Sequence, residues 1–209
     1  MSRREADELI SAGRAEINGQ TANLGRPVNP GDRVSVDGRT VDLAPLVYLS
    51  LNKPIGYISS RRGQGAGTIY DLLPQQYRGL KSVGRLDKDT SGLILLTNDG
   101  DWSHQMTHPK FKKLKIYEVR LDKPLSPKDK TAVELGVRLA DGPSRLKFRA
   151  NGGSGPGYVI QMSEGRNRQI RRTFLALGYR VDKLHRIRFG PYSLNGLKSG
   201  QFKEIRRLN

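Results

Sequence analysis

The chain has 209 residues, of which 35% are hydrophobic, and its 37 Lys and Arg against 20 Asp and Glu give a net charge of +17. This charge predicts a polyanionic partner, with RNA, DNA and acidic membranes as the candidates. No apolar stretch approaches the roughly 20 residues of a membrane span, no signal-peptide pattern opens the chain, and the absence of Cys excludes disulfides and thiolate chemistry. We therefore expect a protein that binds nucleic acid, and the lack of Cys fits a cytoplasmic location.

The positive charge is unevenly distributed along the chain. Residues 1–43 hold six basic and seven acidic side chains, a net charge of −1, which leaves 31 basic and 13 acidic side chains, a net charge of +18, for residues 44–209. The polyanion-binding surface is therefore predicted in the second part. We divide the chain into a small module (1–43), a linker (44–46) and a main domain (47–209).

The small module is predicted to be an α/β unit. A short helix is expected to end at Gly13, and short strands follow at residues 15–17 and 33–36. Asn18-Gly19 and Asp37-Gly38 have the composition of hairpin turns. So few large apolar residues predict only a marginal core for this module.

The main domain is predicted to be α+β with a largely antiparallel sheet, because strands outnumber helices and come in successive runs. Helices are expected at residues 99–108, 126–135 and 167–177, and strands at residues 47–51, 93–96, 115–121, 145–150, 158–162, 181–189 and 202–205. A Gly-rich turn at residues 151–155 joins two of these strands.

Residues 84–100 combine charged side chains with a rigid apolar run. Asp87 and Asp89 lie among basic residues such as Arg85, and the apolar run Leu93–Leu96 follows at once. A charged loop anchored on a buried strand is typical of catalytic loops, whereas Asp and Gly are also ordinary turn residues. Both interpretations are open at this point.

Residues 115–121 alternate polar and apolar side chains, the pattern of a half-buried strand. Ile116, Glu118 and Arg120 share one face, and Tyr117, Val119 and Leu121 share the other. Tyr117 is therefore predicted to face the core.

The helix at residues 167–177 has one apolar stripe, and the arginines around it differ in position. Arg168 and Arg172 lie opposite the stripe and are expected in solvent or on phosphates. Arg171 lies at its edge, where it either pairs with a carboxylate, for which Asp87 is a candidate, or extends its head group to the surface. The sequence leaves both open.

Basic residues alternate with apolar and aromatic ones at residues 110–115 and 183–189. Lysine and arginine bind phosphates, and aromatic rings stack on unpaired bases, so against the charge of +18 these segments favour nucleic-acid contact over a merely solvated surface. His104 and His108 share a helical face, but no Glu lies between them as in zinc proteases, and no metal site is expected.

These segments together resemble the RsuA branch of the pseudouridine synthases, the group that contains RsuA, RluB, RluE and RluF. Residues 84–93 (GRLDKDTSGL) resemble the family's catalytic-Asp motif, 51–56 (LNKPIG) its entry strand, 115–119 (KIYEV) its tyrosine motif and 164–172 (EGRNRQIRR) its third motif, all in the family's order. Residues 1–43 resemble the latter part of the S-four (S4) RNA-binding domain, so we expect a partial module. The resemblance implies the pseudouridine synthase fold, with a central, mostly antiparallel mixed sheet flanked by helices and loops.

The reaction implied by this resemblance is isomerisation of a specific uridine to pseudouridine in RNA, without cofactor or metal. The C–N glycosidic bond is broken, the base is turned, and its carbon 5 is joined to the sugar. Asp87 would attack the anomeric carbon or remove the 2′ proton, and both routes are open. Arg171 would pair with Asp87, and Tyr117 would stack on the uracil and take the carbon-5 proton.

The resemblance also implies contacts to RNA. Arg85 would fill the stack vacated by the flipped nucleotide, and Leu184 or Ile187 would pack against the base. Contacts to the rest of the RNA are implied for Lys53, Lys112, Lys113, Arg166, Arg168, Arg172 and Arg186.

The substrate expected for this chain is bacterial ribosomal RNA, as a stem-loop or an assembly intermediate, bound by a monomer. The similarity of the motif residues to RluF favours large-subunit rRNA as the substrate, while small-subunit rRNA and tRNA remain open as alternatives. The main alternative is a non-catalytic RNA-binding or ribosome-assembly factor, which gives no reason for Asp87, Tyr117 and Arg171 all to be present. A DNA-binding protein is less favoured, because no helix-turn-helix or zinc pattern occurs.

Overall fold

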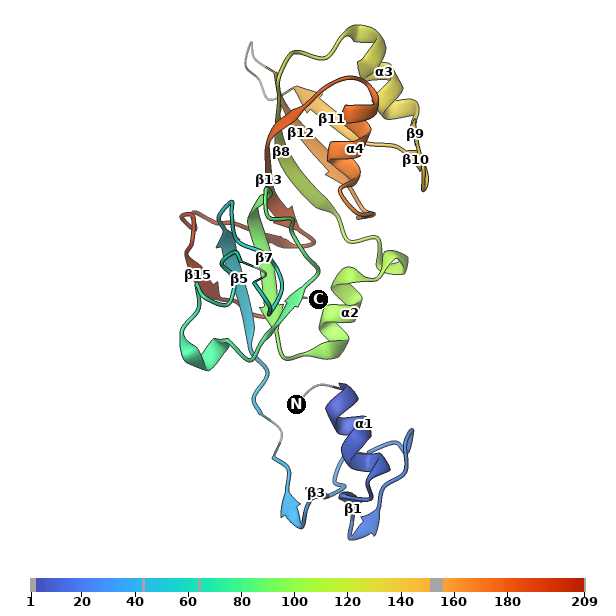
Figure 1. Ribbon diagram of the computed structural model, residues 1–209, viewed down its shortest axis with the longest axis vertical. Coiled ribbons are helices and arrows are strands. Elements are labelled where there is room, and N and C mark those ends of the chain that lie inside the picture. Colours follow the sequence, from blue (N-terminus) through green and yellow to red (C-terminus); the bar gives the residue numbers. More distant parts are fainter. Residues whose placement is uncertain (1–2, 43, 64, 151–155, 209) are drawn as a thin grey trace. The chain divides into compact units, whose positions relative to one another are not determined.

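The computed structural model describes residues 3–42, 44–63, 65–150 and 156–208. The chain divides into two compact units, residues 1–45 and residues 46–209 (Figure 1). Each unit has a hydrophobic core of its own.

The small unit consists of helix α1 (Arg3–Ser11) and a four-stranded antiparallel sheet in the order β2-β1-β3-β4. The strands are β1 (Ala15–Ile17), β2 (Gln20–Thr21), β3 (Val34–Val36) and β4 (Arg39–Thr40). Both predicted hairpin turns are confirmed, since Asn18-Gly19 joins β1 to β2 and Asp37-Gly38 joins β3 to β4 with positive φ throughout. The core cluster is Ala15, Ile17 and Ala22, which is as small as the composition predicted.

A nine-stranded sheet organises the described part of the large unit. Its order is β11-β12-β8-β13-β7-β5-β15, with β6 beside β7 and β14 beside β13. The strands are β5 (Tyr48–Lys53), β6 (Lys81–Val83), β7 (Ser91–Thr97), β8 (Lys115–Leu121), β11 (Lys147–Ala150), β12 (Gly157–Met162), β13 (Val181–Phe189), β14 (Tyr192–Ser193) and β15 (Phe202–Glu204). Neighbours in this sheet are antiparallel except β7 and β13, so the predicted mostly antiparallel, mixed sheet is confirmed.

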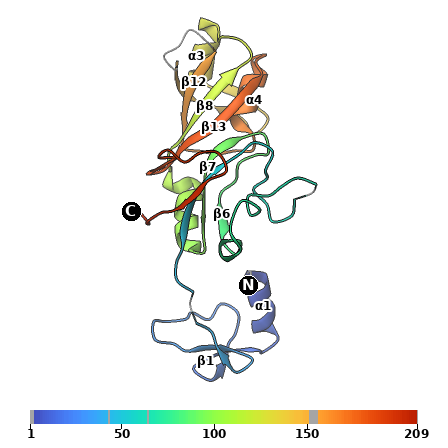
Figure 2. The same ribbon diagram turned by 90° about the vertical axis from the view of Figure 1, so that its left-hand side faces the viewer.

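The parallel pair β7–β13 joins the two halves of the sheet. Ser91 and Gly92 lie opposite His185 and Arg186. Gly92 has φ +106°, and a Cβ there would lie 2.3 Å from the Arg186 carbonyl oxygen, so the close approach requires glycine. Figures 1 and 2 show β13 running alongside β8 from the part of the sheet near α4 towards β7.

β7 is buried along its whole length because both of its faces are covered. Leu93 and Leu95 pack in a cluster with Trp102, whereas Ile94 and Leu96 belong to the main core. This two-sided burial explains why the sequence shows an uninterrupted apolar run at this strand and no alternation.

The helices of the large unit are α2 (Gly100–Thr107), α3 (Pro127–Leu135) and α4 (Gln169–Ala176), with short 3₁₀ turns η1 (Gln75–Tyr77) and η2 (Pro109–Phe111). All three predicted helices are confirmed to within two residues at each end. Asp99 caps α2 and Ser126 caps α3 through their side-chain oxygens. A two-stranded hairpin of β9 (Val137–Leu139) and β10 (Gly142–Ser144) was not predicted, and the predicted turn at residues 151–155 lies outside the described residues.

Candidate active site

A cavity of about 360 Å³ opens where the loop before β7, the strands β8 and β13, and the start of α4 meet. Its wall comprises Gly84, Arg85, Leu86, Asp87, Thr90, Thr107, Pro109, Lys115, Tyr117, residues 162–170, Leu184, Arg186 and Phe189. Segments far apart in the sequence are thus brought together at the join between the two halves of the sheet. This volume is in the range of small-ligand sites.

The structure brings seven of the predicted site residues into this wall and leaves six outside it. Those in the wall are Arg85, Asp87, Tyr117, Arg166, Arg168, Leu184 and Arg186, and those outside it are Lys53, Lys112, Lys113, Arg171, Arg172 and Ile187. Of the two apolar candidates for packing on a base, the structure therefore favours Leu184.

The two carboxylates of the loop before β7 have different partners. Arg168 makes a two-point contact with Asp89, at 3.0 Å from each guanidinium nitrogen to its carboxylate oxygen, whereas its Nη1 lies 3.6 Å from Asp87 Oδ2. Burial raises the pKa of Asp89, but the hydrogen bond from Arg168 and the charge of Arg171 outweigh it, and the net shift is downward. Asp89 is therefore held as a carboxylate.

Arg171 pairs with Asp89, and the prediction that it pairs with Asp87 was wrong. Its Nε lies 3.1 Å from Asp89 Oδ2, and its Nη2 donates to the Asp89 carbonyl oxygen at 2.8 Å. Its Nη1 donates to the Val181 carbonyl oxygen, also at 2.8 Å. Arg171 thus ties the loop to α4 and to the start of β13, with 13% of its side chain exposed.

Asp87 remains turned to the cavity with about a third of its side chain exposed, at 37%. Its backbone is fixed, because its carbonyl oxygen accepts from Thr90 N at 3.1 Å. The preceding Leu86 N donates to Ser59 Oγ at 3.1 Å, and the following Lys88 carbonyl accepts from Gly56 N at 2.8 Å. The loop therefore presents an ionisable group on a rigid backbone.

Lys53 lies beneath this loop and does not reach the surface. Its side chain is fully buried, and its Nζ donates to the carbonyl oxygens of Thr90 at 2.7 Å and Pro54 at 2.9 Å. Burial lowers its pKa to about 8, although the charges of Asp87 and Asp89 oppose the shift. The expected RNA contact of Lys53 is replaced by support of the loop, because the side chain is fully buried and its ammonium is taken up by two backbone carbonyls.

The apolar part of the wall is built on neighbouring strands. Tyr117 of β8 is 8% exposed, and Leu184 and Phe189 of β13 are 5% and 1% exposed. The predicted core-facing position of Tyr117 is confirmed. Tyr117 lies opposite Arg186 in the β8–β13 register, so a phenol ring and a buried guanidinium adjoin within one site.

Lys115 was missed by sequence reasoning, although it shares a strand face with Tyr117 two residues on. Its Nζ donates to the carbonyl oxygens of Lys113, Ser163 and Glu164 at 3.4, 3.1 and 3.5 Å. Burial lowers the pKa of Lys115 to about 8, the charge of Arg186 lowers it further, and that of Glu164 raises it. The alternation that placed Tyr117 inside could have identified it.

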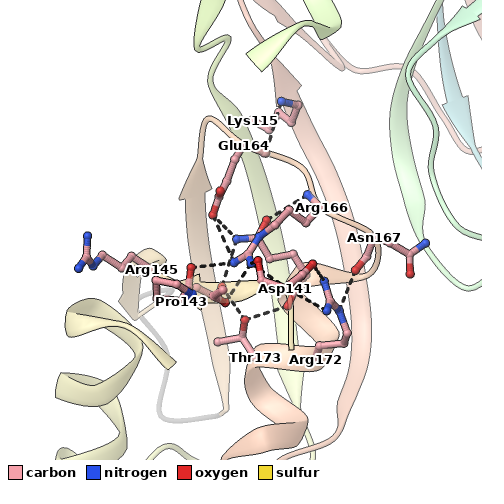
Figure 3. A network of polar contacts seen from close by, with 12 residues as sticks. Lys115, Asp141, Pro143, Arg145, Glu164, Arg166, Asn167, Arg172 and Thr173 are labelled. Carbon is pink, nitrogen blue, oxygen red and sulfur yellow. Dashed lines mark hydrogen bonds and ion pairs between the residues drawn. The ribbon is translucent and has the colours of Figure 1, made fainter. Parts of the chain in front are cut away.

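A second missed residue, Asp141 in the β9–β10 turn, organises two of the predicted RNA-binding arginines (Figure 3). Arg172 contacts both of its carboxylate oxygens at 2.9 and 2.7 Å, and Arg166 Nη1 donates to Asp141 Oδ1 at 2.9 Å. Arg166 also donates to the carbonyl oxygens of Asp141, Gly142 and Pro143. The hydrogen bond from Arg172 holds the pKa of Asp141 below its usual range. Both arginines thus brace the segment before α4.

The family follows from residues 47–176, which match the family described as RNA pseudouridylate synthase, while residues 2–34 match the S4 domain. The chain belongs to the RNA pseudouridylate synthase family. Family members isomerise uridine to pseudouridine in RNA, and the predicted enzyme class is therefore confirmed. No observation favours the non-catalytic alternative.

Similar proteins and structures agree with this family assignment. The chain is 37% identical to the ribosomal large subunit pseudouridine synthase B of Bacillus subtilis (strain 168), over 98% of this chain and 86% of that protein. It is 34% identical to the synthase of the same name from Salmonella typhi, over 98% of this chain and 75% of that protein. A crystal structure of a pseudouridylate synthase superposes with a TM-score of 0.73 at 31% identity, covering 99% of this chain and 91% of that one.

Both relatives are named pseudouridine synthase B, whereas the residues of the motifs were more similar to RluF. Both types belong to the predicted RsuA branch.

Among the described helices, none is long and apolar enough to cross a membrane. The described residues also contain no group of three His, Cys, Asp or Glu placed to hold a metal ion.

Proposed function

We propose that this synthase converts a uridine of bacterial large-subunit ribosomal RNA to pseudouridine, with Asp87 as the reacting carboxylate. The names of the two relatives quoted above support the large-subunit target. The observation that carries the role of Asp87 is its position in the cavity wall with Tyr117. The neighbouring Asp89 takes the close contacts of Arg168 and Arg171, and Asp87 keeps only the longer, 3.6 Å pair with Arg168.

The reaction begins when the C1′–N1 bond of the flipped uridine breaks and its electron pair leaves with the uracil. Asp87 either bonds to C1′ or removes the 2′ proton. The base then turns, and carbon 5 joins C1′ as the Asp87–C1′ bond breaks or as the 2′ proton returns. The carbon-5 proton is lost to Tyr117, whose ring holds the base, while N1 gains a proton. Arg171 acts as a positioning residue, because it fixes the Asp87 loop through Asp89.

Binding of the RNA is assigned to several parts of the molecule. Arg85 lies exposed at the rim of the cavity and fills the stack left by the flipped nucleotide. Lys112 and Lys113 contact backbone phosphates near the cavity, whereas Arg168 is engaged with Asp89. Residues 1–43 act as a partial S4 module, 44–46 as a linker and 47–209 as the catalytic domain, in a cytoplasmic monomer that binds an rRNA stem-loop.

The test is Asp87→Ala in a pseudouridine assay by carbodiimide modification and primer extension on rRNA treated with each purified variant. Asp87→Ala is expected to abolish product formation while the RNA dissociation constant stays close to that of the wild type. Asp101→Asn is the matched control, because Asp101 is exposed on α2 outside the cavity wall. Undiminished product from Asp87→Ala contradicts the assignment.

A further inference from the structure

Two cations adjoin on the floor of the cavity, and the reaction as described above assigns neither a role. Lys115 of β8 lies opposite Phe189 of β13, and Arg186 of β13 lies opposite Tyr117 of β8. The Arg186 Cζ is 4.9 Å and the Lys115 Nζ 5.3 Å from the centroid of the Phe189 ring. Both positive charges therefore flank one buried aromatic ring.

Neither cation has a carboxylate as a hydrogen-bond partner among the described residues. The ammonium of Lys115 donates to three backbone carbonyls, and Arg186 Nε donates to the Leu93 carbonyl at 2.7 Å. Arg186 is 3% exposed, and its buried Nη2 has no hydrogen-bond partner. Buried cations without a counter-charge are costly, and their presence in a substrate cavity indicates a site for negative charge.

The net charge of the cavity wall also indicates a site for negative charge. Its basic residues are Arg85, Lys115, Arg166, Arg168 and Arg186, and its acidic residues are Asp87 and Glu164, which makes five positive and two negative charges, a net of +3. Arg166 and Arg168 are paired with Asp141 and Asp89, which lie outside the wall. The cations not engaged by a carboxylate are then Arg85 at the rim and the two on the floor.

The surroundings of the floor cations favour a base over a phosphate as their ligand. Tyr117, Leu184 and Phe189 are nearly inaccessible apolar neighbours, and a planar base packs against such side chains. A phosphodiester is strongly hydrated and suits the exposed Arg85. Uracil is neutral when bound but has two carbonyl oxygens, and it becomes an anion when the C1′–N1 bond breaks.

We propose that Lys115 and Arg186 hold the carbonyl oxygens of the target uracil and stabilise the uracil anion released by cleavage. This inference rests on the proposed function. When the C1′–N1 bond breaks, the electron pair passes to N1 and is shared with O2 and O4. C1′ gains a bond to Asp87, or C2′ loses its proton, and in both routes the uracil leaves with one negative charge.

The same anion is the species that reattaches. Its carbon 5 bonds to C1′ as the Asp87 ester bond breaks, or as the 2′ proton returns, and the carbon-5 proton is then lost while N1 gains one. The two floor cations thus stabilise the charge throughout the rotation of the base. Preorganised donors aimed at developing charge typically contribute 10²- to 10³-fold in rate, on the order of magnitude known for oxyanion sites.

The test compares Arg186→Gln and Lys115→Gln in single-turnover reactions on RNA that carries either uridine or 5-fluorouridine at the target position. Fluorine withdraws electrons and makes the uracil a better leaving group, so less stabilisation is needed. Each variant is expected to lose on the order of 10²-fold in the rate of C–N cleavage with uridine. The loss with 5-fluorouridine is expected to be about tenfold smaller.

Controls separate this role from folding and from RNA affinity. Arg120→Gln removes one positive charge from an exposed position of β8, outside the cavity wall, and should leave the rate unchanged. Thermal melts report whether the buried Arg186 is needed for folding, and the half-buried Lys115 provides the second variant if it is. Equal losses on both RNAs, or a loss confined to the RNA dissociation constant, overturn the inference.

Failure of the proposed function gives a different result in the same experiment. If the wild-type protein leaves both RNAs unchanged, the assigned substrate is wrong. If the wild type is active and Asp87→Ala remains active, the role of Asp87 is wrong. Both outcomes differ from the result that contradicts only the role of Lys115 and Arg186. In that result the wild type is active, and the two variants lose the same factor in cleavage rate on both RNAs.

Discussion

The two carboxylates of the loop before β7 differ in what surrounds them, and this difference assigns their tasks. Asp89 receives Arg168 and Arg171, which lower its pKa and fix the loop. Asp87 keeps a single, longer ion pair of 3.6 Å with Arg168. The oxygens of Asp87 are therefore not held by close guanidinium hydrogen bonds, and the arginines support the loop through Asp89, two residues further along the chain.

Sequence patterns could place Tyr117 but not the partner of Arg171. Strand alternation fixes which face Tyr117 shares, and the structure agrees. The Arg171–Asp89 contact spans 82 residues, and Asp87 and Asp89 are two residues apart, so no local pattern distinguishes them. The burial of Lys53 could not be predicted either, because it depends on strands from distant parts of the chain that pair with β5.

The hydroxyl of Tyr117 is expected to be needed for turnover but not for base stacking. Tyr117→Phe keeps the ring in the cavity wall and removes the group proposed to take the carbon-5 proton. We expect a loss of 10²- to 10⁴-fold in the single-turnover rate, the usual range for a general base, with little change in RNA affinity. Tyr70→Phe, outside the cavity wall, is the control. A normal rate for Tyr117→Phe removes this role.

The pKa of Lys115, lowered to about 8 mainly by burial, predicts a pH dependence of the reaction. The charged groups that face it are Arg186 from β13 and Glu164 from the segment after β12. The single-turnover rate is expected to fall as pH rises through about 8, because the ammonium that faces the uracil loses its proton. Lys115→Arg should lessen this decline, since a guanidinium stays charged. The part that remains is assigned to Lys53 beneath the Asp87 loop, whose pKa is also lowered to about 8.

Loss of stability does not account for such a decline. Because the pKa of Lys115 falls from 10.5 to about 8 on folding, the folded protein binds fewer protons than the unfolded chain between these values. The contribution of this group to the free energy of unfolding therefore rises with pH across that window. Unfolding midpoints measured at pH 7 and pH 9 check this, and an unchanged decline in Lys115→Arg contradicts the assignment.

At the scale of elements, the site depends on one pair of neighbouring parallel strands. β7 carries the Asp87 loop at its start and β13 carries Leu184 and Arg186, and these strands form the parallel pair in the described sheet. The apolar run predicted that β7 is buried, and periodicity predicted β13. Their pairing was not predictable, because parallel partners need a long connection and no local turn signal marks them.

Gly92→Ala is expected to disrupt the pairing of β7 with β13. A Cβ would lie 2.3 Å from the Arg186 carbonyl oxygen, and φ is +106°, so both strain and a backbone clash arise. We expect a loss on the order of 3 kcal/mol or more in the free energy of unfolding, together with lower activity because Arg186 is displaced. The change is measured by urea denaturation, as a shift of the unfolding midpoint with an unchanged m-value.

Gly100→Ala is the matched control for this prediction. Gly100 begins α2, and nothing lies within 4 Å of a Cβ built there. Alanine is a better helix former than glycine, so the change is expected to be neutral or stabilising by at most about 1 kcal/mol. Equal effects of the two substitutions contradict the importance of the β7–β13 approach.

At the scale of the whole molecule, charge and fold divide along the same boundary. Residues 1–45 carry six basic and seven acidic side chains, so residues 46–209, with 31 and 13, hold a net charge of +18. Composition alone shows this division of charge. It could not show that Arg166, Arg168, Arg171 and Arg172 are engaged with Asp141 and Asp89, which leaves other residues for RNA phosphates.

Lys112 and Lys113, which follow the cavity-wall residues Thr107 and Pro109 in the sequence, are therefore expected to contribute to the salt dependence of RNA binding. The logarithm of the association constant should fall linearly with the logarithm of salt concentration. The double variant Lys112→Gln/Lys113→Gln should reduce the slope by about 1.4, since each contact with single-stranded RNA contributes about 0.7. Lys128→Gln/Lys130→Gln removes the same charge from exposed positions of α3 and should change the slope less. Equal slopes in the two double variants would mean that a diffuse field, and not local phosphate contact at the cavity, attracts the RNA.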